Sequence, residues 1–81
     1  MDDLTRALRV SFPLRDAPRP QGRDFYQFPY FVRGETYDAV ALDLRLRIRA
    51  HMVVTRHTTV WNVTVERSRE DPDLLLCSYF M

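Results

Sequence analysis

The chain has 81 residues, of which 46% are hydrophobic, and a formal net charge of +1. This composition excludes a disordered tail, and a charge so close to zero gives no field that would draw the whole chain to nucleic acid or to a membrane surface. We expect a single domain over residues 1–81 with a small core, because folding at this size buries only about 60% of the surface that the unfolded chain exposes.

The basic residues and the single cysteine give further indications of the protein's origin and cellular compartment. All twelve basic residues are arginine. A GC-rich coding genome explains this bias, and the alternative is that arginine is needed for bidentate contacts with a partner. One cysteine, Cys77, excludes an internal disulfide and favours a reducing compartment. No signal peptide is visible after Met1, and no apolar run is long enough to span a membrane, so we expect a cytoplasmic protein that makes no membrane contact.

The N-terminal residues 2–12 fit two patterns. One is a helix behind an acidic cap, and the other is a strand in which Leu8, Val10 and Phe12 alternate. We favour the strand, over residues 7–12, with a short covering helix as the alternative.

A proline-rich loop and an aromatic strand are predicted next. Residues 13–24 contain three of the five prolines and predict a surface loop. Residues 25–33, FYQFPYFVR, predict a strand that Pro29 either places at a sheet edge or bends in the middle, because proline cannot donate to a ladder. The two faces of this strand would be Tyr26, Phe28, Tyr30 and Val32 on one side, and Phe25, Gln27, Pro29, Phe31 and Arg33 on the other. We expect these aromatic side chains in the core, and a platform for stacking bases is the functional alternative.

The clearest pattern runs from Leu42 to His51, LDLRLRIRAH, where apolar and polar residues alternate. This period of two predicts a half-buried central strand, which we extend to residues 42–54. The competing structure is a helix over residues 36–52 with one apolar stripe formed by Tyr37, Val40, Ala41, Leu44, Ile48 and Met52. Since that helix leaves Leu42, Leu46 and Val53 on its far side, we favour the strand.

The remaining segments complete the predicted sheet. Residues 59–67 can fold back on the central strand around a loop at 55–58, in a register that pairs apolar with apolar and polar with polar residues. Residues 74–80, LLLCSYF, predict a last strand with apolar side chains on both faces. If that strand lies at an edge, it can pair with a second copy and form a homodimer.

The predicted fold is therefore α+β or all-β, built on a small antiparallel sheet. It has a three-strand C-terminal meander over residues 42–54, 59–67 and 74–80, the aromatic segment 25–33 alongside, and an N-terminal strand or short helix.

No pattern indicates catalysis, a cofactor or a metal site. His51 and His57 have no spacing typical of a metal site, and Cys77 lies in an apolar strand where a buried side chain is expected. The chain has no glycine-rich phosphate loop. We therefore predict that the protein is not an enzyme and binds no cofactor or metal.

The best functional lead is a predicted stripe of arginines. On a strand, Arg45, Arg47 and Arg49 would project from one face about 6.8 Å apart. We interpret the chain as an interaction protein of the inhibitor or adaptor kind that phages and mobile elements encode, which occludes a partner protein with an acidic surface. The predicted contact residues are Arg45, Arg47, Arg49, His51, Tyr26, Tyr30 and Tyr79. The alternative is a nucleic-acid-binding β-sheet that uses the three arginines and nearby aromatics, which the near-neutral charge disfavours.

Overall fold

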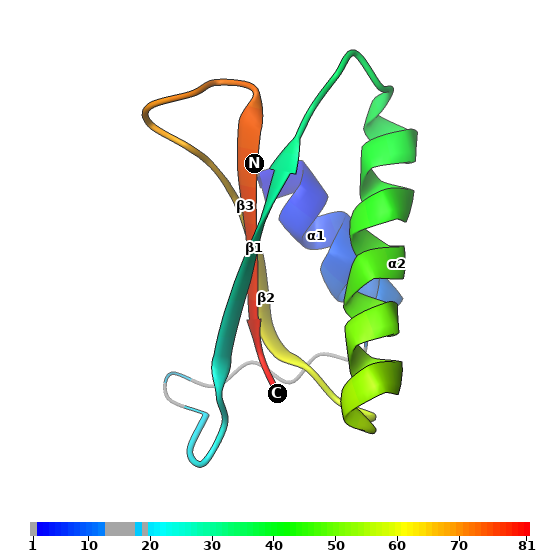
Figure 1. Ribbon diagram of the computed structural model, residues 1–81, viewed down its shortest axis with the longest axis vertical. Coiled ribbons are helices and arrows are strands. Elements are labelled where there is room, and N and C mark those ends of the chain that lie inside the picture. Colours follow the sequence, from blue (N-terminus) through cyan, green and yellow to red (C-terminus); the bar gives the residue numbers. More distant parts are fainter. Residues whose placement is uncertain (1, 13–17, 19) are drawn as a thin grey trace.

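The computed structural model describes residues 2–12, 18 and 20–81. Two helices and three strands follow one another as α1 (Asp2–Ser11), β1 (Phe25–Phe31), α2 (Tyr37–Thr55), β2 (Trp61–Arg67) and β3 (Leu74–Phe80). The strands form an antiparallel sheet in the order β1-β3-β2, and both helices lie on one side of it (Figure 1). The predicted α+β class with a small antiparallel sheet is confirmed.

The predicted central strand over residues 42–54 is wrong, because this stretch belongs to α2. Thr36 caps the helix by accepting a hydrogen bond at Oγ1 from the backbone N–H of Ala39, and Asp38 places a negative charge in the first turn. The helix ends at Arg56, which is in the left-handed conformation with φ of 59°. The predicted pairing of this stretch with residues 59–67 is therefore also wrong.

The alternation of apolar and polar residues suggested a strand because this stretch carries a period of two together with a helical period. In α2 the buried residues are those spaced by three or four positions, Val40, Ala41, Leu44 and Ile48. Leu42 and Leu46, which the strand pattern counts as core, are 49% and 54% exposed. Leucine and arginine are also good helix formers, so local propensity favours the helix.

The predicted N-terminal strand over residues 7–12 is wrong too, and the covering helix that was its alternative is confirmed as α1. Leu4, Leu8 and Phe12 are buried at helical spacing, whereas Val10 is 84% exposed. The predicted loop over residues 13–24 lies partly outside the described residues. Within it, residues 21 and 22 form a turn before β1.

The positions of the three strands agree with the predictions. β1 is an edge strand, and its predicted faces are confirmed, since Tyr30 is buried while Phe25 and Phe31 are exposed. The expectation that the aromatic side chains of this segment lie in the core is wrong for Phe25 and Phe31, which point to the open face of the sheet. β2 and β3 form the predicted antiparallel pair. β3 lies at the centre, so it has no free edge for a second copy. Its inward residues Leu75, Cys77 and Tyr79 are buried beneath the helices, and Leu74, Leu76 and Phe80 emerge on the open face.

The outer edge of β2 is covered by side chains of α1. Thr5 Oγ1 accepts a hydrogen bond from the backbone N–H of Val65 at 2.9 Å and donates to the carbonyl of Val65 at 3.3 Å. Arg9 Nε donates to the carbonyl of Val63 at 3.0 Å. Unpaired backbone groups at an edge are what a further strand would bind, so α1 blocks strand addition at this edge.

Replacing Thr5 with valine tests this role of α1. The change keeps the branched shape but removes the hydroxyl, which leaves the N–H of Val65 without its partner, so we expect the free energy of unfolding to fall by about 1–3 kcal/mol. The measurement is urea denaturation, with Ser11→Ala as a control because the Ser11 hydroxyl donates a hydrogen bond within α1, to the backbone carbonyl of Ala7. A Thr5→Val protein as stable as the wild type would contradict the role.

Candidate functional site

The three candidate arginines do not form one stripe. On a helix, Arg45 and Arg49 are four positions apart and share a side, whereas Arg47 lies on another side. The guanidinium of Arg49 lies 5.1 Å from the ring centroid of Phe12 in the segment that follows α1. The guanidinium of Arg47 lies 5.1 Å from the ring centroid of Tyr30 in β1. The arginines therefore belong to two surfaces on either flank of α2.

Arg45 lines a groove of about 750 Å³ between α1 and α2. Arg6 contributes a second guanidinium from α1, and Asp3 and Asp38 contribute carboxylates near the helix N-termini. Arg45 Nε is buried without a hydrogen-bond partner among the described residues. Tyr37 closes one end of the groove by donating a hydrogen bond from its hydroxyl to the backbone carbonyl of Asp3. The groove thus combines charged groups of both signs with an apolar lining from Ala7, Val10 and Ala41.

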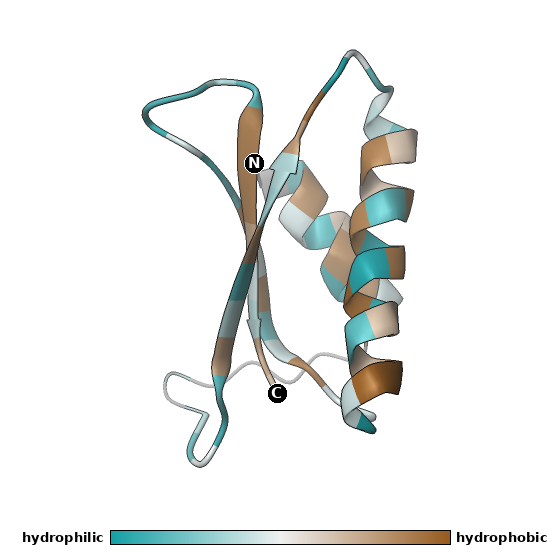
Figure 2. Cartoon of the chain, viewed as in Figure 1, coloured by the Kyte–Doolittle hydropathy of each residue, from teal (hydrophilic) through white to brown (hydrophobic). Residues whose placement is uncertain are grey.

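Next to this groove, α2 carries a row of exposed aliphatic side chains. We call Leu42, Leu46, Val53 and Val54 the outer face of α2, and they are between 49% and 80% exposed. Figure 2 shows hydrophobic residues on the side of α2 that is turned away from the sheet. Since the opposite side of α2 packs on the core, the helix is apolar on two sides. Strand-based reasoning missed this surface, although the competing helix placed three of the four residues on its far side.

His51, Tyr26 and Tyr79 meet between α2 and the sheet. The Nδ1 atom of His51 lies 2.5 Å from the hydroxyl oxygen of Tyr79, and its ring packs edge-on against Tyr26 with 4.6 Å between centroids. Tyr79 is only 2% exposed, and burial, followed by the nearby Cys77, raises its pKa to about 12. Its phenol therefore stays protonated at neutral pH. These predicted contact residues join the helix to the sheet, and of the three only Tyr26 and His51 reach the surface in part.

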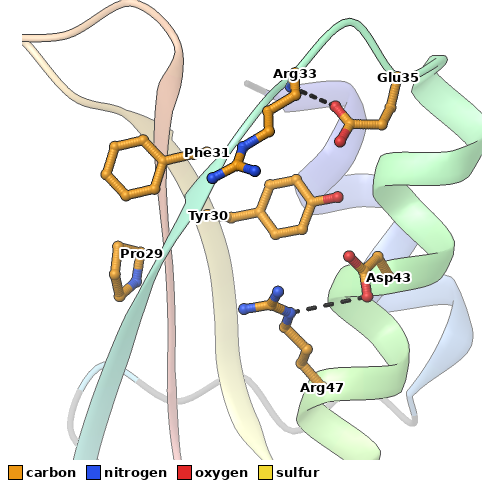
Figure 3. A pocket seen from close by; sticks show the side chains of 7 residues that line it. All are labelled: Pro29, Tyr30, Phe31, Arg33, Glu35, Asp43 and Arg47. Carbon is orange, nitrogen blue, oxygen red and sulfur yellow. Dashed lines mark hydrogen bonds and ion pairs between the residues drawn. The ribbon is translucent and has the colours of Figure 1, made fainter.

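Tyr30 lies at the base of a smaller cavity of about 300 Å³ between β1 and α2 (Figure 3). It is buried, and burial, followed by the neighbouring Asp43, raises its pKa. The charged residues around it are Arg33, Glu35, Asp43 and Arg47. Only Arg47 of these four had been predicted from the sequence as a contact residue.

The open face of the sheet carries aromatic side chains of its own. Phe25 and Phe80 pair across the strands with ring centroids 5.2 Å apart, and Trp61 is the partner of Phe80 on the other strand. The guanidinium of Arg23 lies 4.5 Å from the ring centroid of Trp61. The arginines of α2 lie on the other side of the sheet, so the combination expected for nucleic-acid binding does not share a surface.

Within residues 2–12, 18 and 20–81, no three His, Cys, Asp or Glu side chains lie close enough together to hold a metal ion. None of the helices in the same residues is long and apolar enough to cross a membrane. Comparison with protein-family models, with curated proteins and with solved structures finds no significant match for this chain.

Buried Tyr79 and Cys77 predict a loss of stability in alkali. Burial raises the pKa of Cys77 from 9.0 to about 12 and that of Tyr79 from 10.0 to about 12. Because the unfolded chain releases these protons first, the stabilisation is complete below about pH 9 and is lost as pH rises towards 12.

The measurement is the urea midpoint of unfolding at several pH values above neutrality. We expect it to fall above about pH 9, and to fall less steeply in Tyr79→Phe, which removes one of the two groups. Equal slopes in the wild type and in Tyr79→Phe would contradict this assignment.

Proposed function

We propose that this protein is a non-enzymatic protein-binding domain that docks a partner on the outer face of α2 and on the adjoining α1–α2 groove. The observation that carries the proposal is the row of Leu42, Leu46 and Val53 on α2, each at least 49% exposed, with Val54 exposed beside it. Full burial of such a side chain stabilises by roughly 1.5–3 kcal/mol, and contiguous apolar patches on a small domain are typical of interaction sites.

The charges beside the row favour an acidic partner. Arg45 and Arg49 flank the apolar row on the groove side, and Arg6 lies across the groove. The carboxylates of Asp3 and Asp38 are confined to the end near the helix N-termini. A partner surface that combines apolar side chains with acidic groups opposite the arginines is therefore complementary, and a basic one is repelled.

The proposed action is occlusion. A domain that carries no active site can act as an inhibitor or adaptor by covering a functional surface of its partner, as small proteins of phages and mobile elements do. Arg45 contributes a further driving force, because it lines the groove and its guanidinium can form charged hydrogen bonds with a carboxylate of the partner.

A second candidate function is the binding of single-stranded nucleic acid on the open face of the sheet. Phe25, Phe80 and Trp61 offer rings for stacking, and Arg23 lies over the indole. The test is a gel-shift titration across salt concentrations. An absence of binding to single-stranded DNA and RNA at low salt eliminates this candidate, and a steep salt dependence would favour it over the protein-binding role.

The protein-binding role predicts that Leu42→Glu/Leu46→Glu abolishes capture of the partner from a lysate of the cell of origin. Both side chains are exposed and glutamate is a good helix former, so stability should change by at most about 0.5 kcal/mol. Quantitative mass spectrometry compares the captured proteins with those of Phe31→Ser, a control with similar exposure on another surface.

Arginine variants on the two flanks of α2 can be compared in the same capture assay. Arg45→Ala/Arg49→Ala should reduce capture at least tenfold, and added salt should mimic the change, because charged hydrogen bonds contribute about 1.5–3 kcal/mol each. Arg47→Ala lies on the other flank and should leave capture unchanged. If the leucine variant retains the partner and Phe31→Ser loses it, the proposed docking surface is wrong.

A further inference from the structure

The cavity beside Tyr30 is separate from the proposed docking surface. It lies where β1 and the loop after it approach α2, on the flank of the helix opposite Arg45 and Arg49 (Figure 3). Its volume of about 300 Å³ is at the lower end of the range of roughly 300–1,000 Å³ for small-molecule sites. A ligand of this cavity is therefore smaller than a nucleotide.

The charges in this cavity are sorted by sign. In Figure 3 the guanidinium groups of Arg33 and Arg47 lie on the β1 side of the Tyr30 ring. The carboxylates of Glu35 and Asp43 lie on the side of the Tyr30 hydroxyl. Two positive and two negative groups give a cavity with no net charge but with two poles. A lining of one sign would select an anion or a cation, whereas this one complements a molecule that carries both charges.

Arg47 is positioned by aromatic rings more than by its ion pair. Its guanidinium lies 5.1 Å from the ring centroid of Tyr30 and 5.9 Å from that of Phe28. Its Nε is 3.8 Å from Oδ1 of Asp43, which is longer than the roughly 2.7–2.9 Å of a hydrogen-bonded ion pair. The guanidinium and the carboxylate are therefore oriented side by side and both keep hydrogen-bonding capacity for a ligand.

The negative pole is held in place as well. Glu35 Oε2 accepts a hydrogen bond from the backbone N–H of Arg33 at 2.5 Å, and the carboxylate of Asp43 lies on the side of the Tyr30 hydroxyl (Figure 3). Pro29 and Phe31 of β1 also line the cavity, but their rings project from the strand on the side away from Tyr30 (Figure 3). The groups that can orient a ligand are therefore the four charged side chains around the Tyr30 ring, and a few placed polar groups fix the orientation of a ligand in small-molecule sites.

From this arrangement we infer that the cavity binds a free α-amino acid. Arg33 and Arg47 receive the carboxylate of the ligand. Asp43 and Glu35 receive its ammonium group, beside the ring of Tyr30. The α-amino acid class fits because one carbon carries both of its charged groups, and the cavity holds opposite charges close together, with Arg47 Nε 3.8 Å from Asp43 Oδ1. This inference does not depend on the protein-binding role, because the two surfaces share no residue.

The test is a titration of the isotope-labelled protein followed through its amide NMR spectrum. The probes are L-leucine and glycine, with isocaproate and isoamylamine as analogues of leucine that lack the ammonium or the carboxylate. We expect saturable shifts at residues 30–35 and 43–47 with the amino acids, and at least tenfold weaker binding of each analogue, because each leaves one pole unpaired. The absence of saturation with both amino acids, or equal affinity for an analogue, overturns the inference.

A charge swap separates ligand binding from folding. Asp43→Arg/Arg47→Asp keeps an ion pair between two side chains that are 45% and 52% exposed, so the fold is retained, but it reverses the poles of the cavity. We expect it to weaken leucine binding at least tenfold, while Arg56→Gln, at the C-terminal end of the same helix, leaves the affinity unchanged. An unchanged affinity in the swap variant overturns the inference, whatever the outcome for the docking surface.

Discussion

The packing of α2 against the sheet is the interaction on which the rest of the structure depends. Val40, Leu44 and Ile48 are almost fully buried, and the inward side chains of β3 are buried beneath the helices. These buried residues fix the rotation of α2 about its axis, and this rotation determines which way every other side chain of the helix points. The leucines left over become an exposed outer face, and the arginines divide between two flanks. The positions of both candidate sites therefore follow from the orientation of α2 about its own axis.

Both edges of the sheet are protected from pairing with a further strand. We therefore assign binding to the faces of the domain and not to the sheet edges. α1 bonds the backbone of Val63 and Val65 along the outer edge of β2. Pro29 lies in the middle of the other edge strand, β1, and a proline interrupts the row of donors that an added strand needs. With both edges protected, exposed apolar area remains on the outer face of α2 and on the open side of the sheet.

The sequence predicted the strands better than the helices, for a physical reason. β1 and β2 follow runs of aromatic or β-branched residues, β3 follows a short apolar run, and polar turns bound all three. The stretch from Leu42 to Ile48 satisfies the period of a strand and that of a helix at once. The signal that decides between them is local: Thr36 caps the N-terminus, and Asp38 follows in the first turn. The cavity beside Tyr30 could not be predicted, because it exists only where β1 and α2 meet in space.

The most direct test of the protein-binding role places a nitroxide label at position 46 through Leu46→Cys and, separately, at position 31 through Phe31→Cys. Cys77 is fully buried and its raised pKa keeps it protonated, so only the introduced thiol reacts. Electron paramagnetic resonance then reports the mobility of each label before and after addition of the captured partner. We expect immobilisation at position 46 and no change at position 31. A bound partner that leaves the label at position 46 mobile would contradict the protein-binding role.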